Sequence, residues 1–346
     1  MKRASEDGFA LITTLWLVAL LAVVAVIVEG WITTALDRAA ALKARVANEQ
    51  ALIDATDRAI LGMVTAGFGP RGLEPPPPAA EPGVGQTDIG QTDVVPARQT
   101  PFIALDGRTY RIGDVVIRLQ DEGGLYDLSN SSRDSLARLL DAYGVSTPDS
   151  ETMAVELGQY QATHPDPQTA MRREADYGAA GLPAPRHSRL ISPWEPYRIL
   201  DWPHSAALWH GAPAFADMVT AGPVGGLGIN TAPAPVLAAL AGIDPAAAAR
   251  LVAARQAAPI TVNDLLKSGS KITQSEDHPA EILPSNIIRL RLRIAGDPLA
   301  RIVSIRLTPG EAAPYRLDFS VDRPLSALDR DTESATTPAL PIFSHR

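Results

Sequence analysis

The sequence predicts an α+β fold, in which a long N-terminal helix precedes a small antiparallel sheet and a large all-α segment is inserted into that sheet. Residues 9–66 contain no proline and favour helix throughout. Alternating apolar and polar residues predict strands in residues 108–124 and again in residues 285–323. The pattern of residues 125–284, which lie between these strands, is mainly helical and indicates an insertion.

The N-terminus predicts a membrane anchor. Residues 9–28 carry no charge and follow a polar leader, residues 1–8. A run of this length crosses the ~30 Å hydrocarbon core of a bilayer as one helix. An ordinary secretory signal has a shorter apolar centre followed by a small-residue cleavage site, and this run shows no convincing site of that kind. Basic residues lie on both sides of the run, so the charges leave its orientation open.

The predicted helix is longer than a bilayer requires. At 1.5 Å per residue, residues 9–66 would extend roughly 85 Å. In the second half, helical spacings place five apolar residues on one face: Leu42, Val46, Ile53, Ile60 and Met63. We therefore expect this half to pack outside the membrane on a globular domain, on other helices or on both.

The composition narrows the class of function. The 346 residues suffice for two ordinary domains beyond the anchor. The formal net charge of −8 disfavours a nucleic-acid ligand held by phosphate contacts. Cysteine is absent, which excludes disulfides and thiolate metal sites. Neither Gly-x-Ser-x-Gly nor His-Glu-x-x-His occurs, so we expect a protein that is not an enzyme and requires no cofactor.

Irregular segments flank the first predicted strand and end the chain. Gly67 and Pro70 end the helix, and residues 67–107, with four consecutive prolines and a repeated GQTD, predict a linker. The strand in residues 108–124 has a bend or bulge at Gly113 and runs into the sequence DEGGLYDLSN. Residues 324–346 are expected to form a disordered tail.

The insertion contains a recognisable pair of helices. Thr231 is expected to cap the first, a turn at residues 242–244 follows, and Pro245 begins the second. This order predicts a helix-hairpin-helix, or SAM-like, unit. Two earlier helices are expected at residues 133–143 and 151–163, while residues 164–225 stay unassigned.

Similar hairpin units bind the DNA backbone through amides at a Gly-apolar-Gly turn. Asp244 stands at the second glycine position here, and its carboxylate would repel a phosphate. Arg250 and Arg255 are the cations nearest the turn. A structural role is therefore favoured over DNA binding.

A group of oxygen-bearing side chains follows the first strand: Asp127, Ser129, Ser131 and Asp134. Closely spaced oxygens of this kind can bind calcium. An EF-hand loop, however, also needs a glycine at its sixth position and a glutamate at its twelfth, and both are missing. A solvated loop is the favoured interpretation.

The leader resembles the type IV prepilin class of signals, because a short basic segment ends in Gly8-Phe9 ahead of the apolar run. In that class a membrane peptidase cleaves after the glycine, here Gly8, and methylates the new N-terminus, here Phe9. Most members carry glutamate at the fifth mature position, which is Thr13 in this sequence. Because it lacks that carboxylate, the chain resembles a filament subunit that needs no neighbour ahead of it.

Three ordered segments extend this resemblance over most of the chain except residues 70–101 and the tail. They are RASEDGFALITTLWLVALLAVVAV, DEGGLYDLSN and LGINTAPAPVLAALAGID. Together they resemble the minor pseudopilin K family of type II secretion systems, also called general secretion pathway protein K. The resemblance implies a pilin-like domain, in which a helix over residues 9–66 accompanies the sheet and the helical insertion.

The family implies an assembly protein that caps or initiates the pseudopilus tip for export of folded proteins across the outer membrane. It implies a single pass through the bacterial inner membrane, with a short cytoplasmic N-terminus and a periplasmic bulk. The implied partners are minor pseudopilins I, J and H, major pseudopilin G, the prepilin peptidase and the inner-membrane assembly platform, without nucleic acid. Structural calcium is compatible with the family, with no ligands assigned.

Thr13 fits a tip subunit. In pilus-like fibres the usual glutamate is thought to meet the N-terminal amine of the preceding subunit, and an unpaired carboxylate in lipid is costly. A tip subunit has no preceding subunit. Two alternatives remain open at this point: a membrane-anchored periplasmic DNA-binding protein that uses the helix-hairpin-helix, and an anchored hydrolase.

Overall fold

One helix, α1 (Glu6–Thr65), forms the N-terminal part of the chain, where the sequence predicts a helix over residues 9–66. The computed structural model describes residues 6–75, 102–130, 132–211, 213–222, 224–270, 279–326, 329 and 337–341, with residues 6–10 by their backbone alone. The chain divides into two units, Met1–Asp54 and Ala55–Arg346, and α1 runs through the boundary between them.

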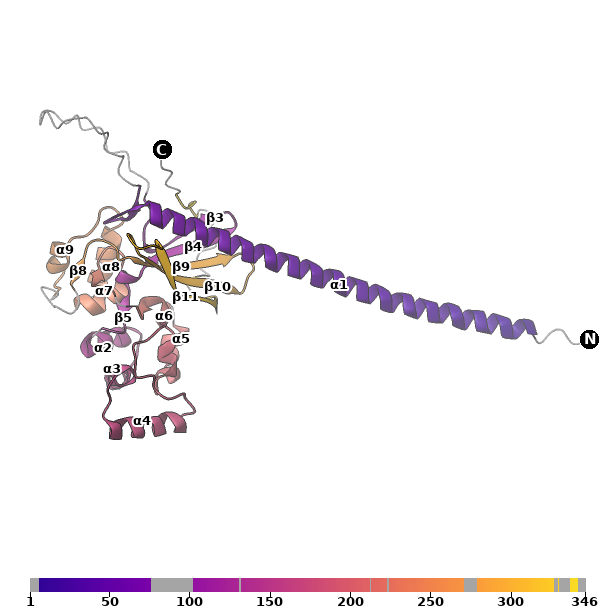
Figure 1. The fold of residues 1–346 in the computed structure, drawn as a ribbon, viewed down its shortest axis with the longest axis horizontal. Coiled ribbons are helices and arrows are strands. Elements are labelled where there is room, and N and C mark those ends of the chain that lie inside the picture. The colour runs from indigo at the N-terminus through magenta and orange to yellow at the C-terminus, as the bar shows by residue number, and fades with distance from the viewer. Residues whose placement is uncertain are drawn as a thin grey trace, which may run out of the picture. The chain divides into compact units, whose positions relative to one another are not determined.

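The second unit is built on a five-stranded antiparallel sheet with the strand order β11-β10-β9-β4-β3 (Figure 1). β4 and β9 are paired neighbours, although the whole helical segment separates them in the sequence. The predicted α+β fold, with a helical insertion between strands of one sheet, is therefore confirmed. The strands are β3 (Asp106–Ile112), β4 (Val115–Asp121), β9 (Ile287–Ile294), β10 (Leu299–Leu307) and β11 (Tyr315–Pro324).

The region predicted as one strand with a bend at Gly113 is a β-hairpin instead. Gly113 has a φ of 58° and lies between β3 and β4, which are joined by only two residues. Turns this tight need left-handed backbone conformations, which glycine adopts without steric cost. Tyr110 pairs with Ile117 and Ile112 with Val115, so the apolar alternation continues through the turn and hides the reversal.

Within the second unit, the last turns of α1 run along the sheet (Figure 1). Ala55, Ala59 and Met63 are each 1% exposed there, and Ile60 is also buried. The small alanines let the helix backbone approach closely, while the larger side chains fill the remaining space. The other members of the predicted apolar face lie in the first unit and are exposed: Leu42, Val46 and Ile53.

The predicted linker and tail both contain short paired segments. β1 (Gly67–Gly69) and β2 (Gly72–Glu74) form a small hairpin directly after α1. Leu73 and Ile103 exchange backbone hydrogen bonds of 2.9 and 2.8 Å, which tie this hairpin to the chain on the far side of residues 76–101. Near the C-terminus, the Leu340 amide donates to the Arg111 carbonyl at 2.9 Å, so this segment adds to the edge of β3.

In its described residues, the inserted segment contains helices and two small parallel sheets. One sheet pairs β5 (Tyr126–Asp127) with β6 (Val219–Thr220), and the other pairs β7 (Leu227–Gly228) with β8 (Ala280–Glu281). Short 3₁₀ turns lie just before the segment, at η1 (Glu122–Gly124), and within it, at η2 (Glu195–Arg198) and η3 (Trp202–His204). The helices are α2 (Arg133–Ala142), α3 (Thr147–Gln161), α4 (Pro167–Ala179), α5 (Ala206–His210), α6 (Phe215–Met218), α7 (Ala234–Ala241), α8 (Pro245–Ala254) and α9 (Val262–Lys267).

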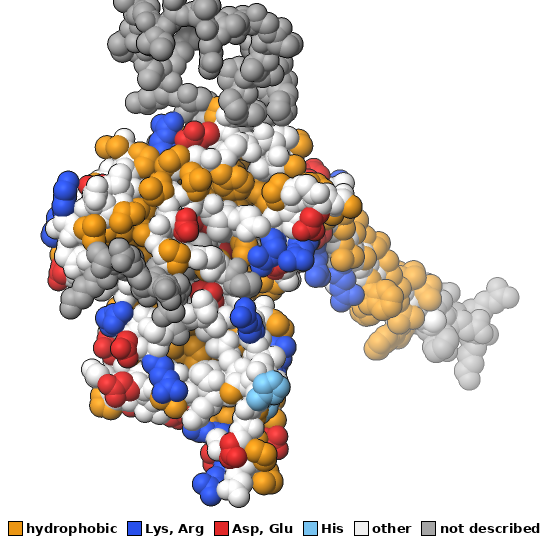
Figure 2. Space-filling model, turned by 60° about the vertical axis from the view of Figure 1, so that its left-hand side comes forward, with side chains coloured by type: hydrophobic (Ala, Val, Ile, Leu, Met, Phe, Trp, Pro, Cys, Tyr) orange, Lys and Arg blue, Asp and Glu red, His pale blue; other side chains and the backbone are white. Residues whose placement is uncertain are grey.

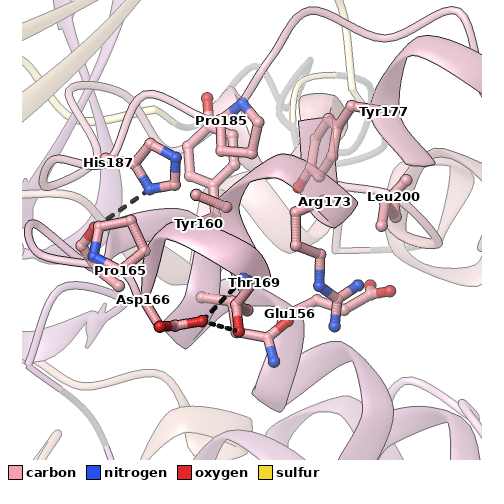
Figure 3. A pocket seen from close by; sticks show the side chains of 13 residues that line it. Glu156, Tyr160, Pro165, Asp166, Thr169, Arg173, Tyr177, Pro185, His187 and Leu200 are labelled. Carbon is pink, nitrogen blue, oxygen red and sulfur yellow. Dashed lines mark hydrogen bonds between the residues drawn. The ribbon is translucent and has the colours of Figure 1, made fainter. Parts of the chain in front are cut away.

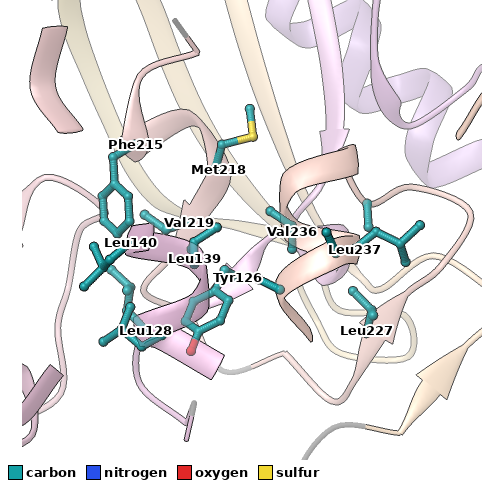
Figure 4. Packing of buried hydrophobic residues seen from close by; sticks show 14 of the residues in the cluster. Tyr126, Leu128, Leu139, Leu140, Phe215, Met218, Val219, Leu227, Val236 and Leu237 are labelled. Atoms are coloured by element: carbon teal, nitrogen blue, oxygen red, sulfur yellow. The ribbon is translucent and has the colours of Figure 1, made fainter. Parts of the chain in front are cut away.

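One apolar core holds this segment together, with side chains from β5, α2, α6 and α7 (Figure 4). Residues 164–225, unassigned from sequence, contribute an aromatic part of it. The Trp202 ring is fully buried and its Nε1 donates to the Met153 carbonyl at 3.2 Å. Phe215 packs edge-on against both Trp202 and Trp209, at centroid distances of 5.5 and 6.2 Å.

Candidate functional site

The two internal motifs DEGG and GINTAP meet where the sheet joins the helical segment. Asp121 is the last residue of β4, and Thr231 follows β7. Both are buried. We use the term motif junction for Asp121, Glu122, Thr231, Ser285 and Arg289, whose side chains connect these segments.

Asp121 is the centre of the motif junction. Its Oδ2 accepts a hydrogen bond from Thr231 Oγ1 at 2.7 Å. Its Oδ1 accepts from the Gly123 amide at 2.9 Å, and from the Ser285 amide and hydroxyl at 3.0 and 2.5 Å. Burial raises the pKa of Asp121, and these hydrogen bonds oppose that increase. One carboxylate thus joins β4, the GINTAP motif and Ser285, which lies two residues before β9.

Glu122 makes a second set of connections. Its Oε1 accepts from Arg289 Nε at 3.1 Å and from Ser304 Oγ at 2.8 Å, while Oε2 accepts from the Thr220 hydroxyl. Arg289 also donates to the carbonyls of Ala216 and Val219, each at 3.0 Å. A buried ion pair is tolerated only when its remaining donors and acceptors are satisfied, as they are here.

Glycines in both motifs allow the two motifs to pack closely against each other. A Cβ on Gly124 would lie 2.6 Å from the Thr231 carbonyl carbon and 2.7 Å from the Ala232 nitrogen. A Cβ on Gly228 would lie 2.9 Å from Asp121 Oδ2. Such distances are well inside van der Waals contact, so both positions require glycine for the motifs to pack together.

A second arginine of β9, Arg291, also binds buried carboxylates. Arg291 Nη1 contacts Asp217 Oδ1 at 2.7 Å, and the Arg291 Nη2 atom contacts Asp329 Oδ2 at 2.5 Å. Asp217 belongs to α6, whereas Asp329 lies after β11. Burial raises the pKa of Asp217, and the charge of Arg291 opposes this. The arginines of β9 therefore bind carboxylates from the inserted segment and from both sides of it.

The motif junction has the properties of a structural connection. Its carboxylates accept hydrogen bonds from neighbouring hydroxyls, amides and a guanidinium group. The hydroxyls of Thr231 and Ser285 donate to Asp121, and all three groups are held between segments of the chain that they connect. These hydrogen bonds connect the helical segment to the sheet, and both belong to the same compact unit.

The sequence reasoning did not assign Asp121, Glu122, Ser285 or Arg289 to a site. Two signals were available. DEGG places two acidic residues directly after an apolar strand, and β9 carries arginines at alternate positions of an otherwise apolar strand. Charged residues on a buried strand require partners, and each pattern supplies partners for the other.

Thr231 is not the helix cap that the sequence predicts. α7 begins after Pro233, which supplies no side-chain cap. The Thr231 hydroxyl is engaged instead by Asp121, and it also lies 3.2 Å from the Gly228 carbonyl. The tertiary hydrogen bond to Asp121 thus replaces the helix-capping role that the local sequence around Thr231 favours.

The predicted turn between α7 and α8 is present, with Gly242 in the left-handed region at a φ of 61°. Asp244 caps α8, where its Oδ1 accepts from the Ala246 and Ala247 amides at 2.8 and 3.2 Å. Its carboxylate therefore occupies the amides that would face a phosphate in a DNA complex. Arg255 is 9% exposed and donates to the Ala232 carbonyl at 2.6 Å. Both findings disfavour the DNA-binding alternative.

Among the oxygen-bearing side chains after β4, those that the structure describes do not form a metal site. Asp127 is buried and its Oδ1 accepts from the Ser129 amide at 2.8 Å, while Asp134 is exposed on α2. Burial raises the pKa of Asp127 to about 6. Ser131 lies outside the described residues. Within the described ranges, no group of three or more His, Asp or Glu side chains could hold a metal ion, and calcium stays an expectation of the resemblance.

α1 carries the predicted processing and anchoring positions. Gly8 and Phe9 lie in its first turns, where only the backbone is described, and Thr13 follows with an exposed side chain. α1 is the one helix of the described residues that is long and apolar enough to cross a membrane, with a mean hydropathy of 2.9 in its most apolar window. Leu15 and Val18 are among its exposed apolar side chains.

Comparisons with known proteins give a family match within the inserted segment and a similar solved structure. Residues 227–278 match the family model described as type II secretion system protein K. No curated protein matches the sequence. A chain in the crystal structure of the GspK–GspI–GspJ complex from the type 2 secretion system of enterotoxigenic Escherichia coli is similar over 63% of this chain and 83% of that chain, with 15% identity and a TM-score of 0.42.

Proposed function

We propose that this chain, a type II secretion protein K by its family-model match, is the minor pseudopilin that caps and initiates the pseudopilus tip. The observation that carries the proposal is the motif junction. It attaches the matched segment, residues 227–278, to a sheet along which the last turns of α1 run. The end of α1, the sheet and the matched segment thereby belong to one compact unit, which supports a role as an assembly subunit.

α1 supports the anchoring step of this proposal. We infer that the prepilin peptidase cleaves after Gly8 and methylates Phe9, which leaves the apolar helix in the inner membrane as a single pass. The N-terminus would be cytoplasmic, and the chain after the apolar run of residues 9–28 would be periplasmic. Thr13 removes a carboxylate that would have no amine to pair with at the tip, where no subunit precedes this one.

The outward face of α1 in the second unit supports contact with other subunits. Leu61 is 60% exposed and Val64 is 40% exposed, on the same helix that buries Met63. Exposed apolar residues at this spacing suit packing against a second helix. The expected neighbours are minor pseudopilins I and J, together with H and the major pseudopilin G; the assembly platform would receive the complex, and export of folded proteins across the outer membrane would follow.

Reconstitution with pseudopilins I and J tests this proposal. The full chain in detergent is expected to recover both pseudopilins in one complex. Leu61→Asp is expected to weaken recovery because it places a charge on the exposed apolar face, whereas Leu61→Met, which keeps an apolar side chain at the same position, serves as the matched control. Failure to recover either pseudopilin, or equal recovery by the two variants and the unmodified chain, would contradict the proposed assembly surface.

A further inference from the structure

A polar cavity of about 120 Å³ lies between the β1–β2 hairpin, the start of β3 and the C-terminal end of α8. Its walls carry one carboxylate, that of Asp106, and three guanidinium groups, so we call it the arginine cavity after Arg71, Arg108 and Arg255. Basic and acidic side chains are interspersed over the face that Figure 2 shows, whereas three arginines gather around this one cavity. A concave site lined by an excess of one charge concentrates ions of the opposite sign.

The carboxylates near the arginine cavity do not balance its cations. Asp106 is shared, because its Oδ2 accepts from Arg108 Nε and Nη2 at 3.3 and 3.1 Å and also lies 3.8 Å from Arg255 Nη2. Glu74 Oε1 lies 3.5 Å from Arg71 Nε, which is longer than the ~2.7–2.9 Å of a charge-assisted hydrogen bond. Three guanidinium groups thus face two carboxylates, and one positive charge remains.

Part of this positive charge is buried. The Arg255 side chain is 5% exposed, and its Nη1 donates to the Ala232 carbonyl at 2.6 Å. Burial lowers the pKa of Arg255, and the charge of Asp106 opposes this. An anion in the adjacent cavity would stabilise the buried cation without touching it, because Coulomb attraction is stronger away from water.

Arg71 and Arg108 are accessible to a ligand in the cavity. Their side chains are 34% and 39% exposed. The guanidinium carbon of Arg71 lies 4.6 Å from the centroid of the Phe102 ring, and Arg108 is held by its hydrogen bonds to Asp106. Both guanidinium groups are therefore oriented in the absence of a ligand. The planar array of N–H donors on arginine matches the two oxygens of a carboxylate.

Size and charge limit the ligand. Pockets that bind cofactors or drug-sized ligands usually have volumes of about 300–1,000 Å³, so the arginine cavity suits one small group. A single excess positive charge matches a carboxylate better than a phosphate group, which carries a charge of about −1.5 to −2 at neutral pH. The cavity between α3 and α4 has no such excess, because Glu156 and Asp166 line it together with Arg173 (Figure 3).

We propose that the arginine cavity binds a single carboxylate group. The carboxylate oxygens accept hydrogen bonds from Arg71 and Arg108, and the negative charge offsets that of Arg255. The group belongs either to a free small acid or to an acidic side chain of another protein, since both offer the same chemistry. This inference goes beyond the proposed pseudopilin function, because it does not depend on α1, on the tip position or on any particular pseudopilin.

Fluorine NMR of trifluoroacetate tests the proposal on the full chain in phosphatidylcholine nanodiscs, with empty nanodiscs as the background. The chain is expected to broaden the trifluoroacetate signal, and acetate should reverse the broadening at constant ionic strength. Phosphate should displace the probe less well than acetate, and the uncharged trifluoroacetamide should keep a sharp signal. A blocked glutamate, N-acetyl-L-glutamic acid α-methylamide, separates the two sources: tighter binding than acetate indicates a protein side chain, and equal or weaker binding indicates a free acid.

Two substitutions in the β1–β2 hairpin should act in opposite directions. Arg71→Gln removes a donor and should weaken acetate binding about three- to tenfold, which is the range that one hydrogen bond supplies. Glu74→Gln removes the carboxylate that competes for Arg71 and should strengthen binding about two- to fivefold. Arg111→Gln makes the same charge change as Arg71→Gln at an exposed position of β3 outside the cavity, and should leave binding unchanged.

Broadening of trifluoroacetate no greater than with empty nanodiscs would overturn the proposal, as would stronger displacement by phosphate than by acetate. Equal effects of Arg71→Gln and Arg111→Gln, or weaker binding by Glu74→Gln, would also contradict it. Near-ultraviolet circular dichroism checks that each variant is folded. If Arg71→Gln does not fold, the direction of the Glu74→Gln effect decides: stronger binding supports the proposal, and unchanged or weaker binding contradicts it. None of these outcomes depends on recovery of pseudopilins I and J.

Discussion

Asp121 Oδ2 accepts a hydrogen bond from Thr231 Oγ1 at 2.7 Å, across 110 positions of sequence and in a fully buried environment. This contact joins the end of a sheet strand to the segment that matches the protein K family model. It accounts for the presence of two distant motifs in one chain, because each motif supplies groups that the other needs.

Loss of the Thr231 hydroxyl should destabilise the fold. Thr231→Val leaves Asp121 Oδ2 without this donor in a buried site, and the free energy of unfolding should fall by about 1–3 kcal/mol. Thr231→Ser retains the hydroxyl and should recover most of the loss. Urea unfolding of the full chain in nanodiscs, followed by near-ultraviolet circular dichroism, measures both. Equal stability of the valine and serine variants would mean that the hydrogen bond contributes little.

A methyl group at Gly124 should be poorly tolerated. Gly124→Ala places a Cβ 2.6 Å from the Thr231 backbone, so the two motifs must separate, at a cost of at least about 2 kcal/mol in unfolding free energy. Gly158→Ala is the control, since Gly158 lies within α3 with open space around it. That change should leave stability unchanged or raise it by up to about 1 kcal/mol. Similar effects of the two alanines in the same unfolding assay would refute the close packing of the motifs.

Removal of the guanidinium from the motif junction should be costly. Arg289→Met leaves Glu122 buried without its ionic partner, and losses of about 3–5 kcal/mol are typical of such changes. Arg301→Met breaks an ion pair with Asp322, whose side chain is 46% exposed, and should cost less than about 1 kcal/mol. Thermal and urea unfolding of both variants compare the pairs directly. A cost for Arg289→Met no larger than for Arg301→Met would argue against a structural junction.

Glu156 should make the stability of the folded chain decrease as the pH rises from about 4.5 to 7. Burial raises its pKa from 4.5 to about 6, so the folded state binds this proton more tightly than the unfolded state does. The associated stability is present below about pH 4.5 and is lost as the pH rises through about 6. The shift corresponds to about 2 kcal/mol at most, and partial hydration of the carboxylate reduces it to about 1 kcal/mol.

Glu156→Gln tests this dependence, because it removes the titration and keeps an acceptor for the Asp201 amide. Relative to the unmodified chain, the variant should gain about 1 kcal/mol in stability between pH 4.5 and pH 7. Glu151→Gln, at an exposed position of the same helix, provides the control. A stability difference for Glu156→Gln that is constant across this range would contradict the assignment.

Much of the fold could be predicted from the sequence because it is encoded locally. The long run without proline specifies α1, and the alternation of β9 specifies a strand. The turn and proline around Gly242 and Pro245 specify the boundary between α7 and α8. Each of these signals requires only neighbouring residues, so tertiary structure does not have to be known in advance.

The sequence-based predictions are wrong where contacts between residues distant in sequence determine the structure. Alternation continues through the turn at Gly113, so two strands resemble one with a bend. Thr231 has the sequence context of a cap, but Asp121 competes for its hydroxyl. Arg255 is buried, and its Nη2 lies 3.8 Å from Oδ2 of Asp106, which begins β3 and is far away in the sequence. The candidate site itself could be found only as two motifs, because their pairing exists in three dimensions alone.

The most direct test of the pseudopilin assignment is the N-terminal mass of the protein recovered from cells with and without the prepilin peptidase. The account predicts a mature chain that begins at N-methylated Phe9 and appears only when the peptidase is present. Retention of residues 1–8 in both strains, or cleavage after the apolar run, would contradict it.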